Sequence, residues 1–416
     1  MASLLIIASL AAQVGTTGGQ TPSTATDATA PQSRSGQSTY ADLELGAGYS
    51  TNPSMSVVND HGGGFGRASV HAVHSRVSPL STTLVSAYAE NVSYTNHQGS
   101  NQSATVFGRH DASVSEHARL FIDGSATYQE SGQLDTRLLA IPVIPPAIPG
   151  GTVTPPILIP PNSDFFSIRG RQYAFTGHGG GSFSLSARYS FSLSSGIEHV
   201  VLHSGAFRTN YTTIPVSLAY DRQLSEQTTI GARVTAAHTD YNGPTHTRTI
   251  TPQVTGHTRL ASNMTFDAAL GVSFARFDDG VIARNSTGLS AQANLCGQGE
   301  TSVFCGHVSA DEQTATTAGP ARSVSGGIDF SQRLDANQSV QFSLGVTHYS
   351  TPISVVAGHT FSSSTYYHAA AGYSRAISRR FFGGVNLAAR KLTQNGPDPK
   401  THLNVSLFIR YRLGDI

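Results

Sequence analysis

Strict alternation of apolar with polar or very small residues is the feature that most constrains the fold of this chain. Between Ala41 and Ser50, every second residue is Ala, Leu or Tyr, and the residues between them are Asp, Glu, Gly or Ser. Side chains of a β-strand point alternately to opposite faces, so this segment has one apolar face and one polar face. Helical spacing does not account for the pattern. The alternation recurs at residues 120–128, 214–220, 230–236, 266–274, 340–346 and 403–413.

Short turns divide the alternating segments at regular intervals. Seven turns have an apolar residue followed by small, acidic or polar ones, and they start at Val77, Val114, Leu185, Leu224, Leu260, Leu334 and Ile377. The intervals are 36–43 residues, except for two intervals of 71 and 74 residues. Each interval of 36–43 residues accommodates two membrane-spanning strands of about 9–11 residues. The two doubled intervals are predicted to contain long loops, at roughly Ser131–Arg171 and Asp279–Pro320.

This spacing predicts an all-β fold with a single closed, antiparallel transmembrane barrel of about sixteen strands. Short turns at the end that carries both termini and longer loops at the other end are typical of outer-membrane barrels, with the turns in the periplasm and the loops outside the cell. Closure removes the exposed sheet edges and satisfies every backbone hydrogen-bonding group in lipid. A soluble β-sandwich or β-helix is the alternative, but it requires more charged residues on its outer surface.

The composition supports a barrel that faces lipid. Only 12% of the residues are charged, about half the globular average of roughly 25%. The net charge is +1 and 38% of the residues are hydrophobic, which excludes disorder driven by charge. Beyond the first dozen residues, no apolar run approaches the ~18–20 residues of a membrane helix. A nearly neutral chain without a basic cluster also argues against nucleic-acid binding.

The N-terminal segment has the features of a secretory signal. Residues 1–12 have an apolar core from Leu4 to Leu10 followed by small residues, although no Lys or Arg precedes Arg34, so the basic n-region is weak. We predict a signal peptide at 1–12; a short buried strand is the alternative. Residues 13–39, rich in Gly, Ser, Thr and Pro, are predicted to form a flexible linker. The barrel is then assigned to 40–416.

Two segments carry a family resemblance. Tyr40–Pro53 (YADLELGAGYSTNP) resembles the opening strand of bacterial outer-membrane β-barrel porin families, some of whose members are associated with exopolysaccharide loci. Leu403–Leu413 (LNVSLFIRYRL) is similar to the C-terminal strand that the barrel-assembly machinery reads. The chain departs from the pattern because it ends Gly414-Asp415-Ile416, without a terminal aromatic, and has no Trp. The resemblance implies location in the cell outer membrane, with lipid and the assembly machinery as partners.

The resemblance also implies a polar channel for solutes, including saccharide or exopolysaccharide export. Function would lie on the inward face of the barrel. Strand parity places these charged residues inward: Asp42, Glu44, Arg67, Arg109, Asp111, Asp123, Arg233, Asp267, Arg390, Arg410 and Arg412. Of the 26 basic residues only Lys391 and Lys400 are lysines, and guanidinium groups suit carboxylates and anionic sugars. Two interpretations stay open: a channel whose charges orient a solute, or a structural or assembly component of a surface-polysaccharide system, with an internal Arg–carboxylate network and a plugged lumen.

One of the predicted long loops is rich in proline. Leu134–Ser167 contains eight prolines among apolar residues, and proline cannot serve in a central strand. We expect this loop to be extended or polyproline-like. It either folds inward and constricts the channel, or forms a cap that lies on the outer rim or touches a partner subunit.

The other predicted long loop contains both cysteines. Cys296 and Cys305 enclose eight residues, and in an oxidising compartment two cysteines this close are expected to form a disulfide. A metal site is not expected, since two thiols lack two further ligands at motif spacing.

No catalytic motif accompanies the barrel pattern. The glycine runs at 62–64 and 179–181 lack the G-x-S-x-G elbow that an esterase requires. Neither a phosphate-binding G-x-x-x-x-G-K-[ST] loop nor an H-E-x-x-H pair is present. We therefore expect neither enzymatic activity nor a cofactor.

Overall fold

A computed structural model describes residues 36–52, 62–95, 100–131, 170–204, 207–281, 283–315, 319–356, 359–394 and 401–414. Within these ranges the chain forms one eighteen-stranded sheet. The strands are β1 (Gly36–Ser50), β2 (Gly63–Val77), β3 (Ser81–Tyr94), β4 (Ser100–Ser115), β5 (Ala118–Ser131), β6 (Gly170–Ser186), β7 (Tyr189–Ser204), β8 (Phe207–Gln223), β9 (Thr228–Tyr241), β10 (His246–Ala261), β11 (Met264–Asp278), β12 (Ala283–Gln298), β13 (Ser302–Ala315), β14 (Gly319–Arg333), β15 (Gln338–Val356), β16 (His359–Ala376), β17 (Phe381–Gln394) and β18 (His402–Gly414).

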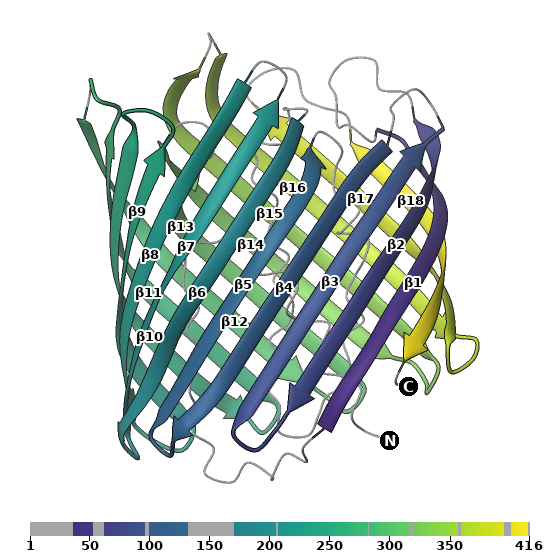
Figure 1. The fold of residues 1–416 in the computed structure, drawn as a ribbon, viewed down its shortest axis with the longest axis horizontal. Helices are drawn as coiled ribbons and strands as arrows, with labels where there is room; N and C mark the ends of the chain where they lie inside the picture. The colour runs from purple at the N-terminus through teal and green to yellow at the C-terminus, as the bar shows by residue number, and fades with distance from the viewer. Residues whose placement is uncertain are drawn as a thin grey trace.

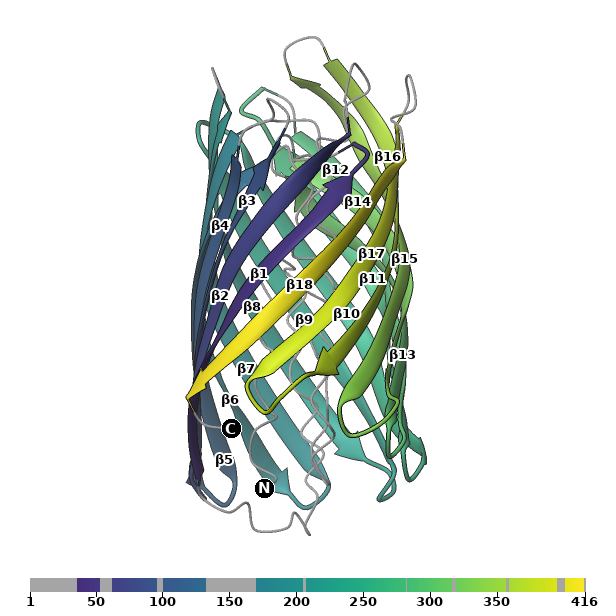
Figure 2. The same cartoon turned by 90° about the vertical axis from the view of Figure 1, so that its right-hand side faces the viewer.

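The sheet closes on itself. Each strand is hydrogen-bonded to the next one in sequence, and β1 also pairs with β18, antiparallel, from Tyr40 opposite Gly414 to Ser50 opposite Asn404. Figures 1 and 2 show the resulting barrel of steeply tilted strands, in which β18 lies beside β1. The predicted all-β, closed antiparallel barrel is therefore confirmed. Within the described residues, no helix is long and apolar enough to cross a membrane.

The two ends of the barrel differ in their connections. β1 begins and β18 ends at one end, called here the turn end, where all the connections contain two to four residues. In these turns Ser78, Ser225, Asp335 and Ser378 accept backbone N–H bonds with their side-chain oxygens, the usual reason for Ser and Asp in tight turns. The opposite end, the loop end, has connections of very unequal length. The proline-rich segment Leu134–Ser167 lies outside the described residues.

Within the described residues the barrel has eighteen strands, slightly more than the predicted number of about sixteen. The interval 279–320, predicted to be a long loop, contains β12 and β13, joined by an eighth short turn at 299–301. The outward positions in the first half of β12 are Ala283, Asn285 and Thr287, so apolar alternation is missing there. Backbone pairing with β11 over the whole length of β12 holds this strand instead.

The two cysteines lie on these two additional strands. Cys296 and Cys305 lie directly opposite each other on β12 and β13, near the turn end, and are joined by a disulfide. The prediction that placed both cysteines in a long loop is wrong. At the other boundary, β1 begins at Gly36, so the last four residues assigned to the linker belong to the first strand.

The two faces of the sheet have opposite character. On β1, Leu43 and Leu45 are 43% and 68% exposed. The residues that alternate with them, Asp42 and Glu44, are only 7% and 6% exposed. Large apolar residues are exposed in the same phase along most of the strands, for example Val254, Leu270 and Leu407. Such a continuous apolar exterior is stable only against lipid. The polar residues consequently lie on the inner face of a transmembrane barrel.

Neighbouring residues at the middle of β10 test this assignment. Val254 points outward and Thr255 inward. We predict that Val254→Arg lowers the free energy of unfolding by about 2–4 kcal/mol, the cost of a charge at the bilayer midplane, and that Thr255→Arg lowers it by much less. Denaturant unfolding in lipid vesicles, followed by circular dichroism, measures both. Equal losses for the two variants would contradict the assignment of faces.

Candidate functional site

All eleven charged residues predicted to face inward lie on the sheet face opposite the exposed apolar side chains. The structure brings five of them together where β18 meets β1: Asp42, Glu44, Arg67, Arg410 and Arg412. The others are spread along the rest of the inner wall. The interior thus has a dense charged cluster on one side and separate polar groups on the other.

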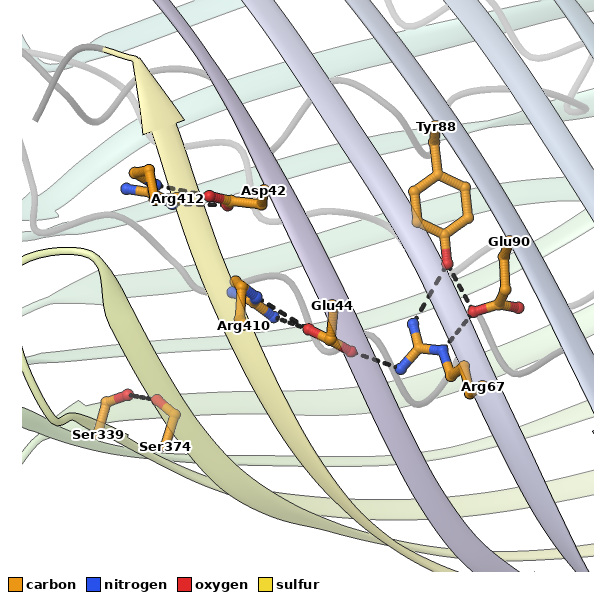
Figure 3. Close-up of polar contacts among 9 residues, drawn as sticks. All are labelled: Asp42, Glu44, Arg67, Tyr88, Glu90, Ser339, Ser374, Arg410 and Arg412. Carbon is orange, nitrogen blue, oxygen red and sulfur yellow. Dashed lines mark hydrogen bonds and ion pairs between the residues drawn. The ribbon is translucent and has the colours of Figure 1, made fainter.

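Two arginines on β18 bind two carboxylates on β1. Arg412 donates from Nε and Nη2 to the two oxygens of Asp42, at 2.7 Å each, in a fork-to-fork arrangement. Arg410 donates from Nε and Nη2 to Oε2 of Glu44, at 2.8 and 2.7 Å. Both pairs are directly opposite in the strand register. Figure 3 shows these bonds crossing the junction between the first and the last strand.

The cluster continues across β2 to β3. Arg67 on β2 donates from Nη1 to Glu44, at 2.8 Å, and from Nε to Glu90 on β3. The Tyr88 hydroxyl donates to Glu90, at 2.7 Å, and accepts a bond from Arg67 Nη2. We call this set the seam network; its members are Asp42, Glu44, Arg67, Tyr88, Glu90, Arg410 and Arg412.

The centre of the seam network is almost completely buried. The Arg67 and Glu90 side chains are each 3% exposed and the Glu44 side chain is 7% exposed. Burying charges costs several kcal/mol per ion, which is offset only when their hydrogen bonds are satisfied. Removing one member therefore leaves its partners as buried charges. This part of the interior has the properties of a structural brace rather than of a surface that contacts solute.

A second polar chain crosses the inner wall halfway along the barrel. Arg233 on β9 donates to the Gln253 carboxamide oxygen on β10, at 2.9 and 2.6 Å. Gln253 donates to Ser290 on β12, which in turn donates to Asp311 on β13. The Gln253 side chain reaches β12 by crossing Gly271 of β11, where an added Cβ would lie 2.8 Å from its Cγ. We call Arg233, Gln253, Ser290 and Asp311 the mid-barrel relay.

Smaller carboxylate pairs with arginine or histidine lie on β4–β6 and on β10–β11. Arg109 binds Asp111 two residues further along β4, at 2.7 and 2.8 Å. Asp123 lies 3.1 Å from His178 Nδ1 on β6, and Asp267 lies 2.6 Å from His257 Nδ1 on β10. The Asp111 and Asp267 side chains are 41% and 43% exposed, so these pairs are far more open than the seam network.

Arg390 is placed differently from the other arginines. It is buried and lies directly opposite His368 on β16 and His402 on β18. His402 Nε2 is 2.7 Å from the Ser50 hydroxyl of β1. In the part of the chain that the structure describes, no group of three or more His, Cys, Asp or Glu side chains could hold a metal ion.

Hydroxyl groups cover much of the remaining inner face. Serine and threonine side chains on neighbouring strands lie within hydrogen-bond distance of each other at Thr105–Thr127, Ser125–Thr176, Thr213–Thr239, Thr251–Ser273, Ser309–Ser325 and Ser339–Ser374. One of these pairs appears in Figure 3. Each hydroxyl offers both a donor and acceptors, so the wall presents many uncharged polar groups.

Sequence reasoning missed several members of both sets. Glu90 and Tyr88 have the inward parity of β3, and Gln253 and Asp311 are inward on β10 and β13. The alternation of Val85, Ala87 and Ala89 on the outer face of β3 would have identified Glu90 as an inward-facing residue. Nothing in the sequence indicates that Gln253 reaches Ser290, because that contact depends on the glycine of the intervening strand.

No protein-family model and no curated protein matches the sequence. Among solved structures, the chain is similar to the FrpB iron transporter from Neisseria meningitidis (F5-1 variant), with 10% identity over 86% of this chain and a TM-score of 0.48. It spans 64% of the length of that transporter. The copper transporter OprC (8% identity, 88% of this chain, 62% of that chain, TM-score 0.46) and OccK2 from Pseudomonas aeruginosa (8% identity, 91% of this chain, 98% of that chain, TM-score 0.44) are also similar.

The architecture itself supports the location. A closed antiparallel barrel with an apolar exterior, a polar interior and short turns at the end where the first strand begins and the last strand ends is the outer-membrane type. The chain is a protein of the cell outer membrane.

The burial of Arg67 leads to a prediction. We expect Arg67→Ala to lower the free energy of unfolding by about 3–5 kcal/mol, because it removes the arginine bound to the buried Glu90 and one of the two arginines bound to Glu44. Arg109→Ala, which breaks a partly exposed pair, should cost less than about 1 kcal/mol. Denaturant unfolding in vesicles measures both by circular dichroism, since the chain has no Trp. A loss for Arg67→Ala no larger than that for Arg109→Ala would show that the network does not brace the barrel.

Proposed function

We propose that this outer-membrane β-barrel is a passive channel for polar solutes, not an enzyme. The observation that carries the proposal is a closed barrel of eighteen strands whose inner face is polar. Barrel diameter grows with strand number, and barrels of about 16–18 strands enclose an aqueous channel. The partly exposed charged side chains Asp111 and Asp267 lie on β4 and β11, away from the buried seam network.

The inner wall favours uncharged, hydroxyl-rich solutes. Four carboxylates of the interior, Asp42, Glu44, Glu90 and Asp111, are paired with arginine, and Asp123, Asp267 and Asp329 lie beside histidine. Pairing with arginine reduces the field that these four carboxylates would exert on cations. The remaining hydroxyl and carboxamide groups match the donors and acceptors of saccharides. Saccharide passage, including exopolysaccharide export, is the finer part of the proposal.

A second candidate has support from the seam network. A structural or assembly component of a surface-polysaccharide system, with a plugged lumen, would need internal charges that brace the barrel rather than contact solute. The buried Arg67 cluster has that character. The open pairs at Arg109–Asp111 and His257–Asp267 favour the channel instead. The two candidates differ in whether the protein conducts ions.

Conductance separates the two candidates. We predict that purified, refolded protein in a planar lipid bilayer gives stable open steps in KCl, and that K⁺ and Cl⁻ carry similar currents because the interior carries arginines as well as carboxylates. Vesicles that contain the protein should swell in isotonic mono- and disaccharide solutions. A bilayer that stays silent although the inserted protein is folded would support the plugged component and reject the channel.

The mid-barrel relay offers a test of where solute passes. Removing a fixed positive charge should make the channel more cation-selective, so Arg233→Ala should shift the reversal potential in a KCl gradient toward the K⁺ potential. Asp311→Asn should shift it toward the Cl⁻ potential. Arg76→Ala, which removes an exposed charge from the outer face of β2, is the control. If the relay variants behave like this control, the permeation path does not pass the relay.

A further inference from the structure

The two strands that close the barrel carry opposite charges on their inner faces. The acidic residues Asp42 and Glu44 lie on β1, and the basic residues Arg410 and Arg412 lie on β18. We propose that this complementarity is a recognition code by which the last strand selects the first strand of its own chain, in one register. The proposal concerns the junction itself and does not depend on whether the lumen conducts.

Each arginine is held in place for its carboxylate. The Arg412 guanidinium lies 4.5 Å from the ring centroid of Tyr40 on β1 and 5.5 Å from that of Phe382 on β17. Its two bonds to Asp42 are parallel, the geometry that makes Arg–carboxylate pairs specific in position as well as strong. Arg410 lies 5.5 Å from the ring centroid of Phe408 on its own strand. The two arginines of β18 are therefore held beside their carboxylates on β1.

Only the native register pairs both carboxylates with the arginines of β18. A one-residue shift would turn the apolar face of β18 inward, so alternation already forbids it. A two-residue shift keeps the faces, and alternation cannot exclude it. In one direction that shift pairs Asp42 with Arg410 and leaves Glu44 opposite Phe408. In the other direction it pairs Glu44 with Arg412 and leaves Asp42 opposite Gly414. Each slipped register therefore loses one of the two Arg–carboxylate pairs.

The same charges disfavour pairing between copies. Free strand edges are templates for association with another chain. If β18 of one copy paired with β18 of another, Arg410 and Arg412 would face arginines, and two β1 edges would bring carboxylates together. Opposing like charges is an effective means of rejecting a wrong partner. The remaining favourable partner for β18 is the acidic β1 edge.

The junction also has contacts that fix its loop end. The Ser50 hydroxyl lies 2.7 Å from His402 Nε2, and the Thr51 amide donates to the Leu403 carbonyl at 2.9 Å. These contacts share the register of the ion pairs, so they stabilise the native alignment once the charges have selected it. Because they are uncharged at Ser50 and Thr51, they provide no repulsion against a second copy.

A charge swap at Asp42 and Arg412 tests the proposal. This pair is chosen because Glu44 also binds Arg67. Asp42→Arg and Arg412→Asp each place like charges at the junction, whereas the double variant restores an opposite pair in the reverse orientation. Asp111→Arg creates a like-charge contact with Arg109 inside the barrel but away from the junction, and is the matched control.

Electrophoretic migration measures closure of the barrel, and disulfide crosslinking measures the register of β1 and β18. The fraction of closed barrel is measured from the faster electrophoretic migration of unheated protein. Register is measured by oxidative crosslinking of Ala47→Cys with Leu407→Cys, which are opposite in the native register, and of Ala47→Cys with Val405→Cys, which become opposite after a two-residue slip.

We expect each single reversal to reduce the native crosslink by about tenfold, with a gain in slipped, open or multimeric species. The swap should recover most of the native crosslink, and Asp111→Arg should close like the unmodified chain. Single reversals that close in the native register as efficiently as the unmodified chain would overturn the proposal. It would be overturned equally by a swap that recovers no more closed barrel than the single reversals.

Discussion

Backbone hydrogen bonding in lipid is the constraint on which this structure depends. No water is present in the hydrocarbon core to satisfy an exposed strand edge, so a sheet that spans the membrane must close. The closing contact is the antiparallel pairing of β1 with β18, which joins residues more than 350 positions apart. Every other strand pairs with its sequence neighbour, and therefore needs only a short connection. The long-range order of the fold is concentrated in this one junction.

The inner face of the closed barrel has two regions that differ in the burial of their charged groups. Beside the junction, charges are buried and bonded to one another, so desolvation makes the loss of any one of them expensive. Along β4–β13, ion pairs such as Arg109–Asp111 are partly exposed, and hydroxyl groups lie between them. The two interpretations that the sequence left open, a brace and a solute channel, thus correspond to different parts of one inner surface. A barrel of eighteen strands has circumference enough for both.

Much of the architecture could be predicted from the sequence, because strand alternation is a local property. The opposite orientations of Leu43 and Glu44 follow from parity alone, and so does the inward position of Arg410 and Arg412. Strand number could not be obtained in the same way. Outward residues of β12 such as Asn285 and Thr287 are polar, and that strand is held by its backbone pairing with β11.

The partners within the interior could not be predicted. Asp42 and Arg412 are 370 residues apart in the sequence. They meet only because the eighteen-stranded sheet closes with β1 and β18 in one register. The relay from Gln253 to Ser290 requires Gly271 between them to lack a side chain. Parity therefore identifies which residues face the interior, whereas the register of the complete barrel decides which of them touch.

The central claim is that one face of every strand contacts lipid and the other contacts a polar interior. Nitroxide side chains placed singly at each position from 249 to 258 on β10, in protein reconstituted into vesicles, measure this directly by electron paramagnetic resonance. We predict a period of two, with the even-numbered positions more accessible to oxygen dissolved in the bilayer and the odd-numbered positions more accessible to a water-soluble nickel complex. Equal accessibility at successive positions, or alternation in the opposite phase, would contradict the account.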